Sequence, residues 1–367
     1  MELCFCKDCN WIYQNLFGSL TARCRLLFMT KASSRELKGL HAFVPVRPPR
    51  TPRYYLLWGL QLIVSPILFP FRLLAVLLSF AISSVSLRIL TFKLDLTKPI
   101  NPFRRTLIRL QTMLFTRLFV WALGCRVVEK DVQNKPDLET DHVVIYNHTN
   151  SLDGAILAML GFTSHINKAS ILKMPIFGLV EISNQGLFVD RNDSSSKQKA
   201  QKAIQERALL ASGPLGLPRE WPIIAGAPEG TTTNGTVLIT FKRGLFAPGK
   251  PIHACHITYD RRLLDVSDAH QDMVLAILKM MLCFRTACTV RYLPKYVPTI
   301  EESNDPDLYA ANVRYYFHVQ SGLPLLDMTG ADKQYYRMQL NDVSKCSNIV
   351  KEQYTECRSG SGHYIAG

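Results

Sequence analysis

Charge is almost absent between Tyr54 and Leu87, where Arg72 is the one charged side chain and Pro66 and Pro70 interrupt an apolar run. The whole run exceeds the ~20 residues that one bilayer crossing requires, whereas each half, before and after Arg72, falls slightly short of it. The pattern therefore favours a bent pair of helices, a membrane hairpin with Arg72 at its tip. One tilted span with Arg72 near its far end is the alternative.

A one-sided apolar pattern follows between Arg104 and Gly124. Basic residues occupy one side of the expected helix, and the other side carries an apolar stripe at helical spacing: Leu107, Leu110, Met113, Leu114, Leu118 and Trp121. This pattern predicts an amphipathic helix at a membrane interface, with a plain core helix as the alternative.

From about Cys125 onward, short apolar runs alternate with helical segments. HVVIYN, GLFVD, WPIIAGA and PIHACHITY are typical of strands, whereas SLDGAILAMLG and SSSKQKAQKAIQERALLAS are typical of helices. Strands interleaved with helices predict an α/β fold with an open, largely parallel sheet flanked by helices. Ligands of such sheets bind beyond the carboxyl ends of the strands.

These patterns divide the chain into four regions. They are a tail and basic Pro/Arg linker (1–53), a membrane-anchoring hairpin and amphipathic helix (54–124), an α/β domain (125–334) and a C-terminal tail (335–367). The formal charge of +14 is concentrated near the anchor, since Pro45 to Leu110 contains ten Lys or Arg and a single acid, Asp95. By the positive-inside rule both flanks of the apolar run prefer the cytosol, which favours a hairpin.

The ten cysteines, spread from Cys4 to Cys357, do not have the spacing of a disulfide scaffold, and reduced thiols on a cytosolic face are the simpler account. Cys4, Cys6 and Cys9 could bind a metal or carry acyl chains, with a flexible tail as the alternative, and no zinc-type partner cluster follows them. A cleaved signal peptide is not indicated, because the apolar run starts some fifty residues into the chain.

The stretch NHTNSLDG places His148 and Asp153 five positions apart. By composition alone such a pair has about a one-in-three chance of occurring somewhere in the chain, so the spacing is a weak signal by itself. Its position is informative, because His148 follows a predicted strand and Asp153 falls in the first turn of the next helix, with Asn150 or Ser151 as the cap. The carboxylate can then fold back onto the imidazole, orienting it as a general base; a polar turn is the alternative.

Two more stretches lie just after predicted strands. GLFVDR ends in Arg191, whose guanidinium could hold an anion, and APEGTTTNG (227–235) offers hydroxyls and backbone N–H groups. A surface ion pair and an ordinary turn are the respective alternatives.

In order and spacing, NHTNSLD, GLFVDR, PEGTTTNG and FKRGLFAPGKPI resemble the four sequence blocks of the glycerolipid acyltransferase superfamily. These enzymes acylate glycerol 3-phosphate and lysophospholipids with acyl-CoA. The likeness runs from about Cys125 to Gln334, and TIEESNDPDLYAANVR (299–314) is similar to the lysophosphatidylcholine acyltransferase branch. The resemblance implies that residues 125–334 are an acyltransferase catalytic domain.

The resemblance also implies a role for each block. His148 would deprotonate the acceptor hydroxyl with Asp153 as its orienting partner; the other blocks would supply substrate-binding residues, namely Gly186, Phe188 and Arg191 for the acceptor phosphate, Glu229, Gly230 and Thr231 for the acceptor site, and Pro251 for acyl-CoA. Many lysophosphatidic acid acyltransferases carry an arginine directly after Glu-Gly-Thr, where this chain has Thr232. The missing charge favours a phosphodiester acceptor over a phosphomonoester.

We therefore expect a membrane-bound, acyl-CoA-dependent lysophospholipid acyltransferase of the endoplasmic reticulum, or of the Golgi or lipid droplets, with its catalytic domain facing the cytosol. Its partners would be membrane lipids, the lysophospholipid acceptor and acyl-CoA as co-substrate, with no bound cofactor, metal or nucleic acid; the sequence identifies no protein partner. The alternatives are a lyso-platelet-activating-factor acetyltransferase, a 1-acylglycerol-3-phosphate acyltransferase and a non-catalytic lipid-binding scaffold. No EF-hand loop is found after Asp332.

Overall fold

The computed structural model describes residues 41–46, 48, 50–190, 193–209 and 220–333. The Cys4, Cys6 and Cys9 cluster, Arg191 and the tail 335–367 lie outside the described residues. The chain divides into a unit of residues 1–41 and a unit of residues 42–367, and the strands and α-helices below all belong to the second.

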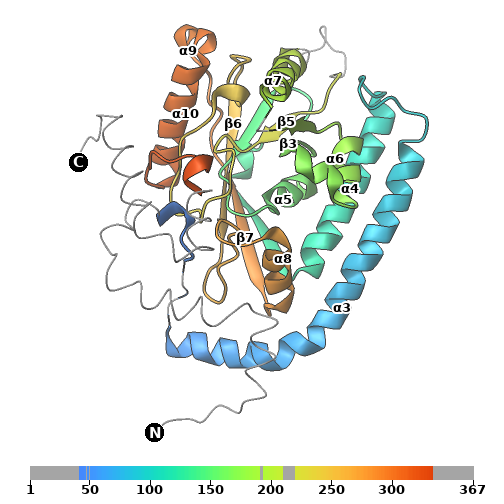
Figure 1. Cartoon of the computed structure of the whole chain (residues 1–367), viewed down its shortest axis with the longest axis vertical. Coiled ribbons are helices and arrows are strands. Elements are labelled where there is room, and N and C mark those ends of the chain that lie inside the picture. Colours follow the sequence, from blue (N-terminus) through green and yellow to red (C-terminus); the bar gives the residue numbers. More distant parts are fainter. Residues whose placement is uncertain (1–40, 47, 49, 191–192, 210–219, 334–367) are drawn as a thin grey trace. The chain divides into compact units, whose positions relative to one another are not determined.

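Within the described residues, seven strands form one sheet in the order β1-β7-β6-β2-β5-β3-β4 (Figure 1). Neighbouring strands pair in parallel except β6 and β7, which confirms the predicted largely parallel α/β fold. The predicted strands and helices of this region are all present, and β1, β3 and β7 are additional. The strands are β1 (Cys125–Lys130), β2 (Val143–Tyr146), β3 (Ser164–Lys168), β4 (Leu187–Val189), β5 (Ile224–Gly226), β6 (Ile252–Tyr259) and β7 (Thr286–Tyr292).

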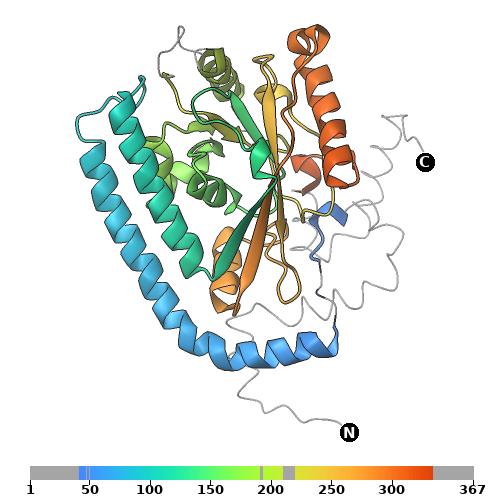
Figure 2. The ribbon, with the colours of Figure 1, turned by 180° about the vertical axis from the view of Figure 1, so that it is seen from behind.

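Helices cover both faces of the sheet, because successive side chains of a strand point to opposite faces. Val144 and Tyr146 pack with one group of helices, α3 (Pro52–Leu90), α4 (Pro102–Ala122), α5 (Asp153–Met159), α6 (Phe177–Ser183) and α8 (Met273–Leu282). Val143 and Ile145 pack with α7 (Ser194–Leu209) and α10 (Pro306–Ser321). In Figures 1 and 2, α4 and α10 accordingly lie on opposite sides of the strands. Short elements complete the fold: α9 (Ile300–Asn304), η2 (His41–Phe43), η3 (Val132–Asn134), η4 (Ala169–Lys173) and η5 (Arg243–Leu245).

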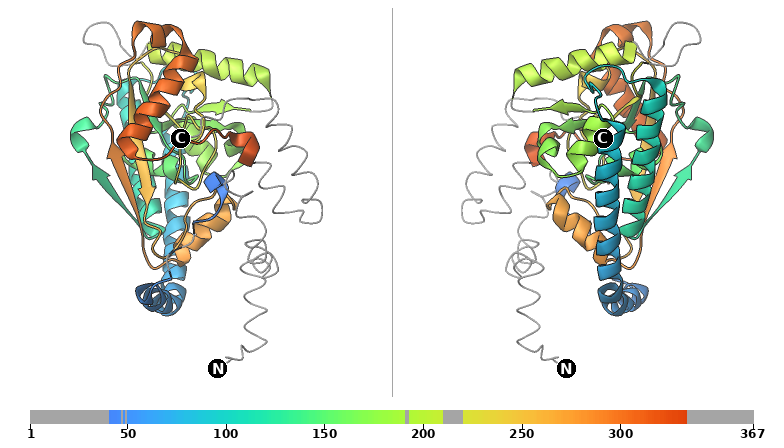
Figure 3. Two further views of the ribbon diagram at one scale, coloured as in Figure 1. Left: turned by 90° about the vertical axis from the view of Figure 1, so that its left-hand side faces the viewer. Right: turned by 90° about the vertical axis from the view of Figure 1, so that its right-hand side faces the viewer.

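The apolar run forms one helix, α3, and the predicted pair of helices with a reversal at Arg72 is wrong. Pro66 and Pro70 lie inside the helix. Each removes one backbone hydrogen bond and bends the helix without ending it, because apolar helix formers continue on both sides. Figure 3 shows the bend, since the first turns of α3 are seen nearly along their axis while the rest runs vertically. The chain instead reverses after Leu90, and α4 returns beside α3 (Figures 1 and 2).

Arg72 does not occupy the tip of a hairpin, as the sequence suggested. Its Nη1 donates to the carbonyl oxygens of Met281 (2.7 Å) and Cys283 (2.6 Å), and its Nη2 donates to that of Phe284 (2.9 Å). These carbonyls follow or end α8, where a helix leaves its last acceptors without partners and favours a positive charge. The charge inside the apolar run therefore ties α3 to the end of α8.

The predicted amphipathic helix exists as α4, but its apolar stripe does not face the core. Leu110, Leu114, Leu118 and Trp121 are exposed, whereas the opposite side buries another apolar set that includes Phe115. Most large hydrophobic side chains of α3 are exposed as well, and α3 is the one helix in the described part of the chain that is long and apolar enough to cross a membrane. These uncovered apolar faces indicate membrane association and favour the interfacial interpretation of α4.

Candidate active site

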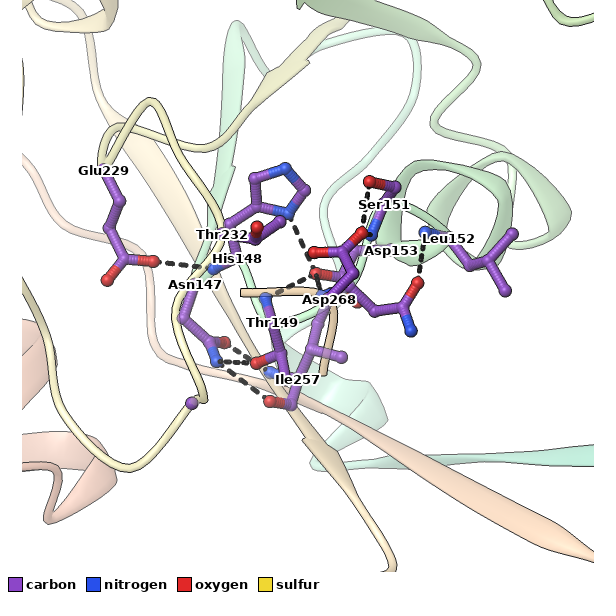
Figure 4. Close-up of polar contacts among 12 residues, drawn as sticks. Asn147, His148, Thr149, Ser151, Leu152, Asp153, Glu229, Thr232, Ile257 and Asp268 are labelled. Carbon is purple, nitrogen blue, oxygen red and sulfur yellow. Dashed lines mark hydrogen bonds and ion pairs between the residues drawn. The ribbon is translucent and has the colours of Figure 1, made fainter. Parts of the chain in front are cut away.

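Three neighbouring parallel strands bring the candidate site together at their carboxyl ends. His148 follows β2, Glu229 follows β5 on one side of it, and Tyr259 ends β6 on the other side. This is the edge of an α/β sheet at which ligands bind. Figure 4 shows His148 and Glu229 in loops at this edge and Asp153 at the start of α5.

The structure joins His148 and Asp153 as the sequence suggested. His148 Nδ1 lies 3.0 Å from Asp153 Oδ2, and the same oxygen accepts the backbone N–H groups of Thr149 (2.8 Å) and Asn150 (2.9 Å). The Asp153 side chain is fully buried, whereas that of His148 is 22% exposed. The carboxylate thus accepts the hydrogen bond of Nδ1 and fixes the tautomer of the ring. Nε2 is then the nitrogen that can accept the proton of an incoming hydroxyl.

The expected helix cap is wrong, because α5 begins after Leu152 without a side-chain cap. Both expected caps have other partners. Asn150 donates through Nδ2 to the carbonyl oxygen of Val266, and Ser151 donates through Oγ to Asp268 Oδ2. The Ser151 backbone N–H donates to the same Asp268 oxygen (2.7 Å). The segment between β6 and α8, far along the chain, therefore holds the turn between His148 and Asp153 by hydrogen bonds.

Tyr259 is a member of the site that sequence reasoning missed. Its hydroxyl donates to Asp153 Oδ1 (2.5 Å), the carboxylate oxygen that does not contact His148. Burial first, and then the nearby carboxylate, raise the pKa of Tyr259 well above its ordinary value, so the phenol stays protonated as a donor. Its position at the end of a strand was the available signal, but the partner lies 106 residues away.

Asn147 fastens the other side of the turn to β6. Its Nδ2 donates to the carbonyl oxygen of Ile257 (2.9 Å), and its Oδ1 accepts the N–H of the same residue (2.7 Å). The side-chain amide thus copies the pairing of a neighbouring strand at the point where β2 has ended. Hydrogen bonds of Asn147 therefore hold one end of the turn, and those of Asn150 and Ser151 hold the other. Together they set the position of His148.

Glu229 contacts the backbone of His148. Oε2 accepts the backbone N–H of His148 (2.7 Å), and Oε1 accepts that of Ile239 (3.2 Å), so this fully buried carboxyl group braces the base. Burial raises the pKa of Glu229 to about 8, against the opposing effect of the two N–H donors. Thr233 completes the brace, because its N–H donates to the carbonyl oxygen of His148 (2.7 Å). Gly230 adopts a positive φ (64°) between Glu229 and the buried Thr231.

The remaining predicted residues are not all brought to His148. Gly186 and Phe188 belong to the β4 edge, which β3 and β5 separate from β2. Pro251 precedes β6 at the amino end of that strand, so about 25 Å of extended chain separates it from the level of Tyr259. Arg191 lies outside the described residues. The structure therefore groups His148, Asp153, Glu229 and the threonines after it, and leaves Pro251 at the opposite end of the sheet.

A metal centre has no candidate ligands in the part of the chain that the structure describes, since no group of three or more His, Cys, Asp or Glu could hold an ion. The described cysteines, Cys125, Cys255, Cys283 and Cys288, are buried and free. Burial raises the pKa of the Cys255 thiol, which disfavours a reactive thiolate there.

Comparison with known proteins gives matches to acyltransferases. Residues 125–257 match the family described as Acyltransferase. The chain is 31% identical over 276 residues to human lysophosphatidylcholine acyltransferase 2, covering 72% of this chain and 48% of that protein. It is 30% identical over 243 residues to the rat protein of the same name (65% and 42%) and 35% identical over 211 residues to human lysophosphatidylcholine acyltransferase 1 (57% and 38%). The chain thus spans less than half the length of these curated relatives.

Among solved structures, the chain is similar to the 1-acyl-sn-glycerophosphate acyltransferase PlsC of Thermotoga maritima. The TM-score is 0.47 and the identity 12%, and the match covers 70% of this chain and 97% of that one.

Proposed function

Because the chain belongs to the acyltransferase family, which its residues 125–257 match, we propose that it acylates a lysophospholipid at the free glycerol hydroxyl with acyl-CoA as donor. The observation that carries this proposal is the His148–Asp153 pair, an imidazole that is 22% exposed and is held at 3.0 Å by a buried carboxylate at the carboxyl edge of the sheet. A lipid-binding scaffold has no need of a base oriented in this way.

In the proposed mechanism His148 Nε2 takes the proton of the acceptor hydroxyl as its oxygen attacks the thioester carbonyl carbon. A tetrahedral oxyanion forms and collapses, the carbon–sulfur bond breaks, and the CoA thiolate leaves and takes the proton from the His148 imidazolium. The acyl group is then esterified to the acceptor and the base is regenerated. Asp153 fixes the ring and stabilises the imidazolium, and Tyr259 fixes Asp153. No covalent acyl-enzyme is required, in keeping with the burial of Cys255.

The acceptor tests the proposal most directly. The full chain in membranes is expected to acylate lysophosphatidylcholine or lysophosphatidylethanolamine in preference to lysophosphatidic acid, because Thr232 stands where a guanidinium would hold a phosphomonoester. Competition between radiolabelled lysolipids, with acyl-CoAs of several lengths and acetyl-CoA, measures the preference. A preference for lysophosphatidic acid would contradict the expected acceptor preference, and acetyl-CoA as the sole donor would indicate the acetyltransferase alternative. No transfer to any acceptor would indicate the non-catalytic lipid-binding scaffold.

We propose that the anchor leaves the N-terminus and the catalytic domain on the cytosolic side of the endoplasmic reticulum, with no glycan on the sequons at Asn147, Asn192 and Asn234. Basic residues flank α3 on both sides, and Asn147 and Asn234 are buried, so a sugar on either is incompatible with this packing. Epitope tags at both termini, read after selective permeabilisation, together with a glycosidase mobility shift, test this. A protected C-terminal tag or a shifted band would place the site in the lumen.

A further inference from the structure

The short helix α8 exposes apolar side chains beside the long helix α3. Val274 is 60% exposed and Leu278 is 39% exposed, and the two lie four positions apart on one side of the helix. The opposite side is buried, with Met280 in the same core cluster as residues of α3 and α4. The one charged residue of α8, Lys279, donates through Nζ to Gln271 Oε1. The exposed side of α8 therefore consists mainly of aliphatic side chains.

The end of α8 lies at the same edge of the sheet as the candidate active site. Cys283 follows α8, and β7 begins shortly afterwards at Thr286. Because β7 runs antiparallel to β6, with Cys288 opposite Tyr259, it begins where β6 ends. Tyr259 ends β6 and donates to Asp153. The end of α8 is therefore close to the strand ends that carry the catalytic pair.

The membrane helix α3 reaches the same edge. Arg72, just after the prolines that bend α3, donates to three carbonyl oxygens at and after the end of α8. The two helices are in contact, and Figures 1 and 3 show α8 beside the bend of α3. Before the bend α3 exposes a further set of apolar side chains, which includes Leu56, Leu62 and Ile63. A bilayer that covers this part of α3 therefore also reaches the exposed side of α8.

We propose that α8 lies in the membrane interface as a further membrane contact, and that it thereby holds the carboxyl edge of the sheet at the lipid surface. The partner is the bilayer, because lipid removes the aliphatic side chains of α8 from water and α3 brings lipid beside them. The segment before α8 links this contact to the active site, since Val266 and Asp268 hold the turn after His148. Delivery of a membrane-embedded acceptor to His148 is the one step that rests on the proposed function.

Site-specific photo-cross-linking tests the lipid contact. Leu278 is replaced by p-benzoylphenylalanine in the full chain, which is placed in phosphatidylcholine vesicles with a radiolabelled acyl chain. The matched control carries the same replacement at Val319, which is 58% exposed on α10, on the other face of the sheet. Irradiation is expected to attach several-fold more labelled lipid at position 278 than at position 319. The absence of a lipid adduct at position 278, or an adduct to a second copy of the chain, would overturn the proposal.

The photo-cross-link needs no activity, and kinetics then test the link to the active site. Val274→Glu combined with Leu278→Glu places two charges in the lipid contact, and both side chains are exposed, so the fold is expected to be retained. The KM of vesicle-bound lysophospholipid is expected to rise about 10-fold, because the aliphatic side chains lose their burial in lipid. The KM of water-soluble acyl-CoA is expected to stay unchanged, and Val319→Glu is expected to change neither KM.

The outcomes separate the membrane contact from the reaction. An unchanged lysophospholipid KM in the double variant, in a protein that gives the lipid adduct and is active, would overturn the positioning of the active site by α8. An inactive wild type that still gives the lipid adduct would overturn the proposed function and support the membrane contact of α8.

Discussion

Replacing His148 with alanine, or Asp153 with asparagine, is expected to lower turnover at least ~100-fold while leaving the protein folded and membrane-bound. His148→Ala removes the base. Asp153→Asn removes the charge but can keep the geometry, because an amide oxygen still accepts the N–H groups of Thr149 and Asn150, and the Tyr259 hydroxyl can turn to accept from the amide nitrogen. Initial rates with saturating lysophospholipid and acyl-CoA measure the losses.

The double variant supplies a sharper test of the pairing. Because the carboxylate acts through the imidazole, the combined loss is expected to be close to that of His148→Ala alone. Cys255→Ser is the control, since Cys255 lies in β6 and is fully buried. A folded Cys255→Ser protein without activity would indicate a thiol nucleophile and exclude direct transfer.

Local pattern was enough to predict four of the seven strands and the contact between His148 and Asp153. β2 is a short apolar run, and His148 and Asp153 are near neighbours whose contact depends on one turn. Residues that come from far along the chain could not be found in this way. Tyr259 and Asp268 meet their partners across 106 and 117 residues, and local periodicity carries no information on such contacts.

The anchor was predicted less well, for two physical reasons. Composition shows that α3 is apolar but not whether Pro66 and Pro70 end a helix or bend it, and the outcome depends on packing against α4. In α4 the predicted stripe, which includes Leu114, is exposed, in keeping with the interfacial interpretation, but the other side also contains large apolar residues, and Phe115 and Phe119 pack against α3 and α6 residues. Arg72 looked isolated because its carbonyl partners lie more than 200 residues away.

Gly235→Ala is expected to have the next largest effect, a loss of activity on the order of 100-fold from a residue that does not take part in the chemistry. Gly235 has a φ of 69°, and a Cβ atom there would overlap Thr149 Oγ1 and lie 2.9 Å from Arg261 Nη2. Thr149 N–H is one of the donors that hold Asp153 Oδ2. Displacing Thr149 therefore moves the carboxylate away from His148, and a shift of about 1 Å at a catalytic group costs about two orders of magnitude in rate.

Two other glycines separate backbone strain from this collision. Gly322 has a similar φ of 74° but no atom within 4 Å of an added Cβ, so Gly322→Ala carries the strain alone, about 1 kcal/mol of unfolding free energy, with activity retained. Gly244 has open space and no positive φ, and Gly244→Ala is expected to change neither quantity. Thermal unfolding and turnover of the three variants, each in the full chain, measure both effects. Equal turnover in Gly235→Ala and Gly322→Ala would show that Thr149 does not transmit the position of the loop to Asp153, because the two variants share the strain and differ in the overlap.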